Sequence, residues 1–507
     1  MESCQNLVSV KHVETIKIVM SCKLRRKVSF PKIILLFLCR PNVETCQHFA
    51  RAKFHSSFLN FHKILGNKKK KIVVDIKSLI SEDNGLKLLR ESAGSELCCI
   101  VRIPQSLARI NLKAYEPKIV SIGPYHHGKE HLKMTQQHKR RFLKFFVAKM
   151  EEKGFVPQEL VKAVSSLEGV IRGSYSEDLG LDSENLVQMM VLDGCFILTL
   201  FFVVSGKVEY TNLDDPIFRM PWILPSIRAD LLLLENQVPY VLLQTLFETS
   251  KLVTCSGLNE IAFEFFNYSL QKPETFWEKH YGLEAKHLLD LIRKTFVPVP
   301  SQRRIKDHSS KSSFNDHEYL GFVLSAKKLH LRGIKFKPRK NTDSILDISY
   351  SNGVLHIPPV VMDDFTASIF LNCVAFEQLY ADSSNHITSY VAFMACLINE
   401  ESDASFLSER RILENYFGTE DEVSRFYKRI GKDIALDLEK SYLAKVFEGV
   451  NEYTSQGFHV HCAEFIHTHF DSPWTFASSF AALLLLLFAA LQVFFAAYSY
   501  FRPPKEK

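Results

Sequence analysis

The chain has 507 residues, 46% of them hydrophobic, so it can bury a large core, and intrinsic disorder is excluded for most of its length. Its net charge of +7 originates in the first 72 residues, which hold fifteen Lys or Arg and three Glu. Eleven cysteines occur without a CxxC pair, which argues against a disulfide scaffold and against a zinc ribbon.

Residues 1–72 are predicted to be a basic, disordered N-terminal extension. A solvated extension is the simplest reading, and a nucleic-acid tail, an organelle transit peptide and a lipid-headgroup binder remain open alternatives. Val28–Cys39 only partly resembles a signal peptide, because its apolar section has seven residues and Arg40-Pro41 stands where small residues would be cleaved. Secretion through this element is therefore not expected.

Residues 73–470 are predicted to form a helical, bilobed globular domain, with a lobe boundary near the basic, Ser-rich stretch 298–316. An amphipathic helix is predicted over 131–153, with one apolar face and Gly154 just past its end. The face consists of Phe142, Phe146 and Met150.

Two strongly apolar segments follow. The first, 183–205, starts at a capping serine and reads as a core helix, because its apolar run of eleven residues is too short to cross a bilayer. The second, 229–247, is predicted to be a core helix kinked at Pro239. Its Glu235, Asn236 and Gln237 need buried polar partners.

A small β-hairpin is predicted around Asn352-Gly353, between an alternating stretch from Leu346 and a returning one that ends at Ile357. The next helix begins at Asp364 or Thr366 and ends near Tyr380. Further helices are predicted over residues 387–399, 404–417, 419–430, where Thr419 and Glu422 form a capping box, and 438–453.

Residues 474–501 are predicted to be a transmembrane helix, since no charged side chain occurs from Ser472 to Phe501. Eleven of the sixteen residues from Phe480 to Phe495 are Leu, Phe or Val, which favours insertion by about 5 kcal/mol in total. Residues 502–507 form a short basic tail. The predicted membrane-anchor residues are Trp474, Phe480, Leu485, Phe488, Phe495 and Tyr498.

Candidate chemistry is sparse. His127 to His131 formally fits HxxEH, an inverted zinc-peptidase pattern, but Pro124 and Gly128 favour a packed turn at a loop-to-helix junction. A histidine cluster before the anchor has ligand types that suit zinc or copper, without a regular spacing. It comprises His459, His461, Cys462, His467 and His469. We predict no catalytic residues, no metal site and no cofactor.

We do not expect the core to bind nucleic acid, because aromatic residues do not alternate with its basic residues. The helical face with Lys139, Arg140 and Arg141 is expected to be solvated. Candidate binding residues are those of the HxxEH turn and the polar positions of the second apolar segment. They are His126, His127, Glu130, His131, Glu235 and Asn236.

Several blocks of the chain resemble the plant domain of unknown function 247 family. They include VRIPQSLARINLKAYEPKIVSIGPYHHGKEHLKMTQQHKRRFL from Val101, MMVLDGCFILTLF from Met189, DLLLLENQVPYVLLQTLF from Asp230, and the hairpin ILDISYSNGVLHIPP. The resemblance covers roughly residues 73–503, and residues 1–72 have no counterpart in it. It implies a mostly helical membrane protein with one C-terminal span and no established enzymatic activity, with some relatives linked to recognition between pollen and stigma.

We therefore expect a mainly α, single-pass membrane protein with a recognition or signalling role, bound to the bilayer by its C-terminal helix and to a protein partner by its core. The alternative is a membrane-bound, metal-dependent enzyme using the His127–His131 region. Weak signal-peptide character favours tail anchoring and a cytosolic core, although Arg502, Lys505 and Lys507 after the span argue for the opposite orientation. The plasma membrane is the expected destination.

Overall fold

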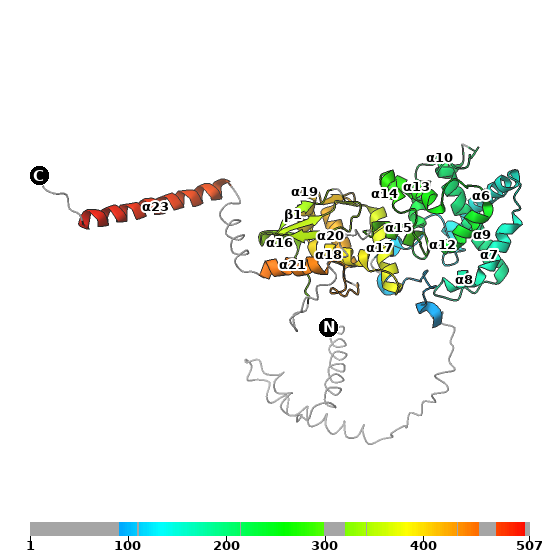
Figure 1. The fold of residues 1–507 in the computed structure, drawn as a ribbon, viewed down its shortest axis with the longest axis horizontal. Coiled ribbons are helices and arrows are strands. Elements are labelled where there is room, and N and C mark those ends of the chain that lie inside the picture. The colour runs from blue at the N-terminus through cyan, green and yellow to red at the C-terminus, as the bar shows by residue number, and fades with distance from the viewer. Residues whose placement is uncertain are drawn as a thin grey trace, which may run out of the picture. The chain divides into compact units, whose positions relative to one another are not determined.

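The computed structural model describes residues 91–108, 111–212, 214–298, 320–340, 342–432, 434–455 and 473–501. Over these residues the chain is mainly helical with two small sheets, which confirms the predicted fold class at that level (Figure 1). The basic extension 1–72 lies outside the described residues, as does nearly all of the proposed lobe boundary at 298–316 and the tail 502–507. These limits stay predictions.

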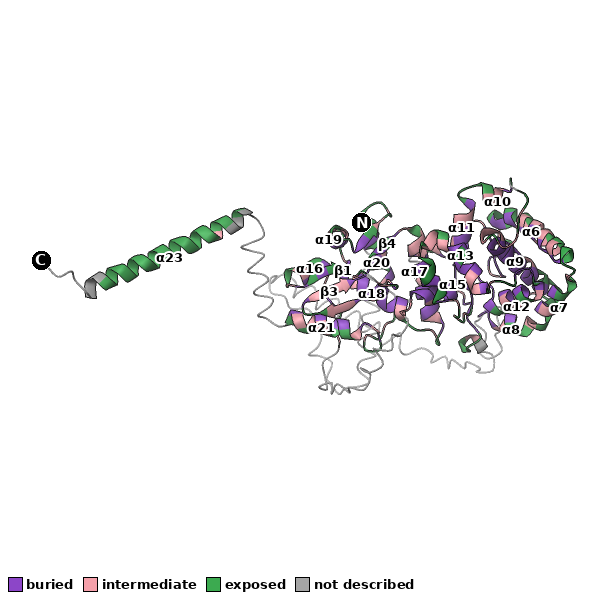
Figure 2. Cartoon of the chain, turned by 45° about the horizontal axis from the view of Figure 1, so that its top comes forward, coloured by how far each residue is buried: buried purple, intermediate pink, exposed green. Residues whose placement is uncertain are grey.

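Helix α9 (Ser183–Val204) lies at the centre of the first helical group, and fifteen of its 22 residues are buried (Figure 2). The prediction of a core helix is thus confirmed, but its cap was misassigned. Asp182 is the N-cap and accepts a bond from the Asn185 N–H, while Ser183 is already helical. The helices packed on α9 are α6 (Lys133–Glu152), α7 (Gln158–Ser166), α8 (Glu168–Gly173), α12 (Tyr240–Ser250) and α13 (Leu258–Leu270).

Helix α6 confirms the amphipathic helix predicted over 131–153, with a preceding 3-10 turn, η3 (Glu130–Leu132). Phe142, Phe146 and Met150 are all buried, as predicted. Gly154 has a φ of +79°, the left-handed conformation that suits a glycine at a helix end.

The single kinked helix predicted over 229–247 is wrong. Helix α11 (Ile223–Asp230) ends before a loop at 231–239, and α12 begins only after Pro239, its N-cap. The side-chain amides of Asn236 and Gln237 bind backbone carbonyls of residues 230, 231 and 233, so local side-chain bonds replace the helical ladder. Several shorter elements complete this part. They are η1 (Glu91–Gly94), α5 (Gln105–Ala108), η2 (Leu112–Ala114), α10 (Pro216–Arg219), α14 (Glu274–Glu278) and α15 (Leu288–Phe296).

The predicted hairpin is confirmed as β2 (Ser349–Ser351) and β3 (Val354–Ile357), joined by Asn352 and Gly353 at φ +48° and +74°. Two left-handed residues in succession are typical of a type I′ turn. The sequence did not reveal the third strand. β1 (Lys335–Pro338) follows helix α16 (Ala326–Leu331) and pairs in parallel with β3.

A second sheet pairs β4 (Val360–Met362) with β5 (Leu413–Asn415) in parallel. The helix predicted over 404–417 is therefore too long, because α19 (Glu401–Glu409) stops before Arg411, whose φ is +57°, and the chain then enters β5. The other predicted helices are confirmed with small shifts. They are α17 (Asp364–Leu379), α18 (His386–Leu397), α20 (Glu420–Ile430) with its Thr419–Glu422 capping box, and α21 (Ala444–Ser455).

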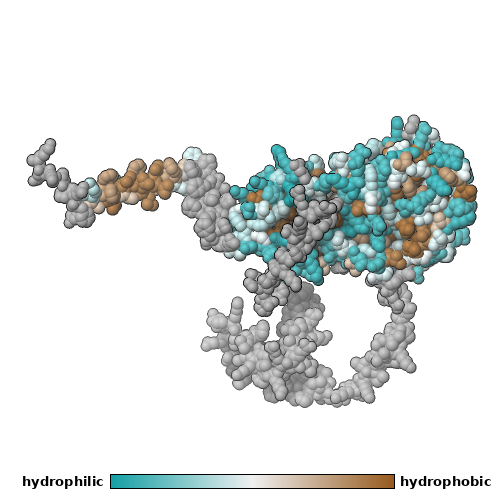
Figure 3. Space-filling view, in the orientation of Figure 1, coloured by the Kyte–Doolittle hydropathy of each residue, from teal (hydrophilic) through white to brown (hydrophobic). Residues whose placement is uncertain are grey.

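Buried hydrophobic side chains from α9 through α21 belong to one contiguous cluster. The last described element is α23 (Pro473–Phe501), an uninterrupted helix of 29 residues whose apolar side chains are exposed (Figures 2 and 3). An apolar helix at the C-terminal end is thus confirmed.

Candidate functional site

The segment 118–126 is held in place by polar side chains from the loop after α11 and from α9. The Asp230 carboxylate accepts the backbone N–H groups of Lys118, Ile119 and Val120 at 2.8–2.9 Å. Burial raises the Asp230 pKa, while these N–H groups act in the opposite direction by stabilising the carboxylate. In the sequence, the only sign of this contact is that Asp230 directly precedes an apolar run of four leucines.

Asn236, a predicted binding candidate, performs the same structural task. Its Oδ1 accepts the Ile122 N–H at 2.7 Å and its Nδ2 donates to the carbonyls of Val120 and Asp230. Gly123 lies close to the same loop, since a Cβ there would be 2.6 Å from the Gln237 carbonyl oxygen. Both amide N–H groups of Asn236 are used and the residue is buried, so it links two chain segments and does not face a ligand site.

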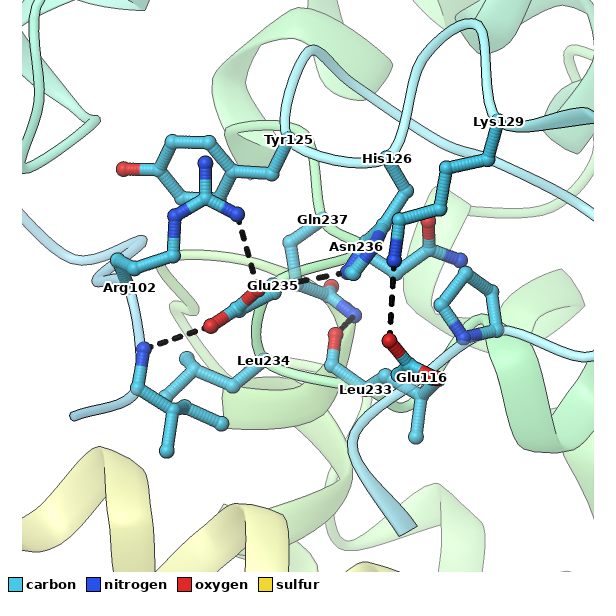
Figure 4. A network of polar contacts seen from close by, with 12 residues as sticks. Arg102, Glu116, Tyr125, His126, Lys129, Leu233, Leu234, Glu235, Asn236 and Gln237 are labelled. Carbon is cyan, nitrogen blue, oxygen red and sulfur yellow. Dashed lines mark hydrogen bonds and ion pairs between the residues drawn. The ribbon is translucent and has the colours of Figure 1, made fainter. Parts of the chain in front are cut away.

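Glu235 lies at the centre of a small polar network (Figure 4). Its Oε1 accepts the Ile103 N–H at 2.7 Å, and its Oε2 is 3.2 Å from Arg102 Nη1. Arg102 also pairs with Glu177 and lies over the Tyr125 ring at 4.2 Å. Burial raises the Glu235 pKa, against the opposing effects of the Ile103 N–H and Arg102.

His126 faces this network from the turn before η3. Its Nε2 lies 3.5 Å from Glu235 Oε2, and neither ring nitrogen makes a hydrogen bond within the described residues. Burial lowers the His126 pKa to about 3, helped by the nearby charges of Lys129 and Arg102. His126 is therefore neutral at physiological pH, and the structure brings together only two of the predicted candidates, His126 and Glu235.

The remaining candidates of the HxxEH pattern do not converge. His127 is exposed, Gly128 turns the chain at φ +83°, and Glu130 and His131 lie on the separate η3 turn. Glu130 pairs with Lys133, and the His131 ring bonds the Pro117 carbonyl. The two histidines thus do not share a helical face, and no group of three metal-ligand side chains occurs among the residues that the structure describes. The histidine cluster at 459–469 lies outside them.

The structure corrects the expected solvated face of Lys139, Arg140 and Arg141. Lys139 is only 1% exposed and pairs with Asp193 of α9 at 2.5 Å, while Asp193 also accepts the Gly123 N–H. Arg141 pairs with the buried Asp215, and only Arg140 is fully exposed. The misjudgement arose because helical periodicity does not reveal an acid that lies 54 residues away in the chain.

A second buried ion network was not predicted. Arg293 of α15 bridges Asp290 and Glu377 of α17 at 2.9 and 3.0 Å. Glu377 in turn accepts bonds from Thr388 of α18. These contacts join three helices of the core, and apart from the Asp290–Arg293 pair on α15 their partners are too far apart in the sequence for a short-range pattern to reveal.

A cleft of about 990 Å³ lies elsewhere on the core. Its lining comes from the 111–118 segment, α11, the end of α13, the start of α17, and α20. None of the six predicted binding candidates lines it. Residues of the lining that enter the argument below are Lys113, Lys118, Asp230, Tyr268, Asp363 and Arg429.

The predicted anchor residues all lie on α23 and are exposed. The six are Trp474, Phe480, Leu485, Phe488, Phe495 and Tyr498. A 22-residue section, Ala477–Tyr498, is long and apolar enough to cross a membrane, and none of it is buried. By length and composition α9 passes the same test, but fifteen of its 22 residues are buried inside the core.

A helical core fastened by buried polar networks, followed by one exposed apolar helix, defines a class of helical proteins with a C-terminal apolar segment. Comparison with known proteins assigns the family. Residues 100–488 match the family model described as plant protein of unknown function (DUF247), and the chain belongs to that family. This confirms the resemblance drawn from the sequence blocks. The matched range begins after the basic extension 1–72.

Two relatives from Arabidopsis thaliana illustrate the range of similarity. UPF0481 protein At3g47200 is 50% identical over 431 residues, covering 82% of this chain and 90% of the relative. UPF0481 protein At3g02645 is 20% identical over 495 residues, covering 79% and 90% respectively. No solved structure matches the chain.

Proposed function

We propose that this protein is a membrane-anchored recognition protein without catalytic activity, held at the bilayer by α23. The observation that carries the proposal is the complete exposure of the apolar section Ala477–Tyr498. At 1.5 Å per residue, 22 helical residues span roughly 33 Å, which matches a hydrocarbon core of about 30 Å. Trp474 and Tyr498 lie near the two ends of this section, where aromatic side chains favour the headgroup region.

The test compares the full chain with a variant that lacks residues 473–507. Microsomes carrying each form are extracted with alkaline carbonate, which removes peripheral proteins. We expect the full chain to stay in the pellet and the truncated form to become soluble with its core folded. A truncated form that still pellets would show that membrane association lies outside α23.

For orientation we propose a cytosolic core and the plasma membrane as destination. Insertion of α23 after translation leaves the core in the cytosol, whereas the opposite topology requires export of the whole core across the bilayer. Protease treatment of sealed microsomes distinguishes the two. A core protected from protease would overturn the cytosolic assignment and favour the positive-inside rule as the guide.

The cleft is the surface that we propose for a protein partner. Beside its rim, Arg228 is 3% exposed, yet its guanidinium has no acid partner among the described residues. It stacks 4.8 Å from both Phe265 and Tyr268, and Nε donates to the Phe265 carbonyl. A buried cation without a counter-ion favours an anionic group nearby.

The free polar groups of the cleft point to the same chemistry. Lys113, Lys118 and Arg429 are exposed and form no ion pair with any residue that the structure describes, although the charge of Lys118 opposes the burial that raises the Asp230 pKa. The lining carboxylates are mostly engaged. Asp230, Asp363 and Glu422 accept backbone N–H bonds, and Glu116 pairs with Lys129, whereas Asp364 has no polar partner among the described residues. Four cations and five carboxylates line the cleft, and most of the carboxylates already accept protein hydrogen bonds, so the exposed cations are the groups that we propose for binding an acidic segment of a partner protein.

A labelled peptide rich in Glu tests this by fluorescence anisotropy with the full chain in detergent. We expect salt-sensitive binding that Arg429→Glu weakens about tenfold or more, since it reverses a charge at the cleft. Arg140→Glu on α6 is the matched control and should leave binding unchanged. Equal binding to both variants would remove the cleft from consideration.

The proposed absence of catalysis is tested by elemental analysis of the purified full chain. Stoichiometric zinc would support the alternative of a metal-dependent enzyme and would overturn the non-enzymatic proposal. The separation of His127 from the η3 turn gives that alternative no geometric support.

A further inference from the structure

A strongly basic surface covers α16 and the strand that follows it. Seven Lys or Arg occur between residues 326 and 340, and no acid occurs between Glu318 and Asp343. We define the basic α16–β1 surface as the six of these side chains that are exposed. They are Lys327, Lys328, Arg332, Lys335, Lys337 and Lys340.

None of these six cations is neutralised by an ion pair among the described residues. The seventh, Arg339, pairs with Asp347 at 2.8 Å, so it is not part of the surface. The nearby Asp403 is occupied by the backbone N–H groups of Lys327, Asn399 and Glu400 and is buried. The six positive charges are therefore exposed to solvent, and no ion pair with a described residue neutralises them, although α19, which packs on α16, also carries the exposed Glu401 and Glu409.

The fold fixes the direction of the β1 cations. Lys335 and Lys337 alternate with the buried Phe336, so they share the exposed face of the three-stranded sheet. Their register partners on β3 are Val354 and His356. The β2 partners of those residues are Ser351 and Ser349, so this sheet face carries no acid.

Helix α21 covers the other face of the same sheet. A Cβ at Gly449 of α21 would be 2.8 Å from the Tyr350 ring, and Tyr350 points away from the Lys335 face. The acids of α21 thus lie on the side opposite the β1 lysines. Figures 1 and 2 both draw α16, β1 and α21 side by side.

The position of this surface in the chain argues for a lipid ligand. Only seventeen residues separate the end of α21 from the start of α23, a length that spans at most roughly 60 Å. A core tethered this closely to a bilayer meets the membrane at a high effective concentration. Leu331, 54% exposed, lies among the basic side chains of α16 and adds an apolar contact.

We propose that the basic α16–β1 surface binds anionic lipid headgroups and so orients the core against the bilayer that holds α23. The inference rests on the proposed membrane anchoring. Each Lys or Arg near an anionic leaflet raises the association constant about fivefold, and the cytoplasmic leaflet is the anionic one. The surface therefore also supports the cytosolic orientation.

The experiment uses the full chain reconstituted into vesicles of phosphatidylcholine alone or with about 30% phosphatidylserine, a content that makes the surface strongly anionic. Hydrogen exchange of the peptide 326–340 is followed by mass spectrometry. We expect at least about threefold slower exchange in the anionic vesicles, with the difference lost in 1 M salt because the screening length falls to about 3 Å. Both leaflets have the same composition, so the orientation of insertion does not affect the result.

Charge-reversal variants identify the surface responsible. K327E/K328E and K335E/K337E should each remove most of the lipid-dependent protection, because all four side chains are exposed and their replacement leaves the core intact. The matched control R140E/K144E reverses two exposed cations of α6 and should keep the protection. Equal exchange in the two vesicle types, or protection that persists in both α16–β1 variants, would overturn the proposal.

Two further readouts separate the alternatives. Carbonate extraction of the same vesicles reports α23 insertion, so a chain that is extracted contradicts the membrane anchor independently of the exchange result. A single-stranded oligonucleotide added to the neutral vesicles probes the other class of polyanion. Protection by the oligonucleotide, without protection by phosphatidylserine, would assign the surface to nucleic acid and refute the lipid proposal.

Discussion

Helix α9 and the apolar section Ala477–Tyr498 of α23 have the same length and a similar apolar composition but opposite surroundings. Each of these 22-residue segments satisfies the length and hydropathy of a membrane span, yet fifteen residues of α9 are buried in the core and none of Ala477–Tyr498 is. Hydrophobicity alone therefore does not decide between a core helix and an anchor. The difference lies in whether other elements of the chain supply partners for the helix.

Helix α9 is surrounded by partners of two kinds. Apolar faces of α6, α7, α12 and α13 cover its side chains, and Lys139 provides the counter-ion for its one interior acid, Asp193. The polar residue of α23, Gln492, is neutral and needs no counter-ion. A charged residue in the middle of an apolar helix thus indicates that the helix packs against other elements of the protein, because an unpaired charge is costly both in a protein core and in a lipid bilayer.

The sharpest way to break the comparison is to place one charge in each helix. Leu198→Arg in α9 buries an unpaired guanidinium at a position with no exposed surface, and we expect the core to unfold, with a loss of about 5 kcal/mol or more. The matched change Leu485→Arg in α23 should leave the core's thermal unfolding unchanged while reducing membrane insertion by about 3 kcal/mol. Thermal melts and carbonate extraction measure the two effects. A destabilised core in Leu485→Arg would mean that α23 packs on it.

Removing the counter-ion of α9 should give the next largest effect. Lys139→Ala leaves Asp193 charged and buried, which costs about 3–5 kcal/mol of unfolding free energy. Urea denaturation of the full chain in detergent measures this loss. Arg140→Ala, at the exposed neighbouring position, is the control and should change stability by less than about 0.5 kcal/mol. A Lys139→Ala protein as stable as the control would show that Asp193 is not held charged.

Close packing around α9 provides a smaller test. A Cβ at Gly194 would lie 2.2 Å from Leu246 Cδ1 of α12, so Gly194→Ala should destabilise the core by about 1–3 kcal/mol. Adding Leu246→Ala makes room and should recover part of that loss relative to Leu246→Ala alone. The double-mutant cycle is measured by the same urea titration. Strict additivity of the two changes would rule out the proposed contact.

The sequence predicted the elements that local signals define. The hairpin at Asn352-Gly353, the capping box at Thr419 and the amphipathic face of α6 depend on neighbouring residues, and all three are confirmed. β1 and β5 were missed because each has only three or four residues and gains its hydrogen bonds from a partner more than fifteen positions away. The helix predicted over 229–247 is wrong because the side-chain amides of Asn236 and Gln237 bind nearby backbone carbonyls and so compete with the helical backbone hydrogen bonds.

The candidate site was less predictable for a related reason. Glu235 and Asn236 were singled out because polar groups in an apolar run need partners, and both have them. Their partners Arg102, Ile103 and Ile122 lie more than 110 residues away, so local sequence patterns do not identify them. The basic α16–β1 surface, by contrast, was present as an acid-free run of Lys and Arg and was overlooked beside the more basic segments elsewhere.

Unlike Asp193, the buried carboxylate of Glu235 is paired with an arginine, Arg102, that is only half-buried, and it also accepts the Ile103 N–H. Burial raises its folded-state pKa above the unfolded value of about 4.3, so the folded protein binds more protons than the unfolded one between these two values. The contribution of Glu235 to stability therefore falls as pH rises through that window and is most favourable below it.

Glu235→Gln removes this pH dependence but keeps an oxygen that can accept the Ile103 N–H. As pH rises above about 4.3, the unfolding free energy of the Gln variant should therefore increase relative to that of the native protein. At neutral pH the two unfolding free energies should differ by about 1 kcal/mol or less. Glu235→Leu also loses the acceptor and should be about 1 kcal/mol less stable than the Gln variant at every pH. Urea titrations at several pH values give both numbers. Parallel stability curves for the native and Gln proteins would show that the Glu235 pKa is not shifted by burial, and that Arg102 and the Ile103 N–H compensate the burial fully.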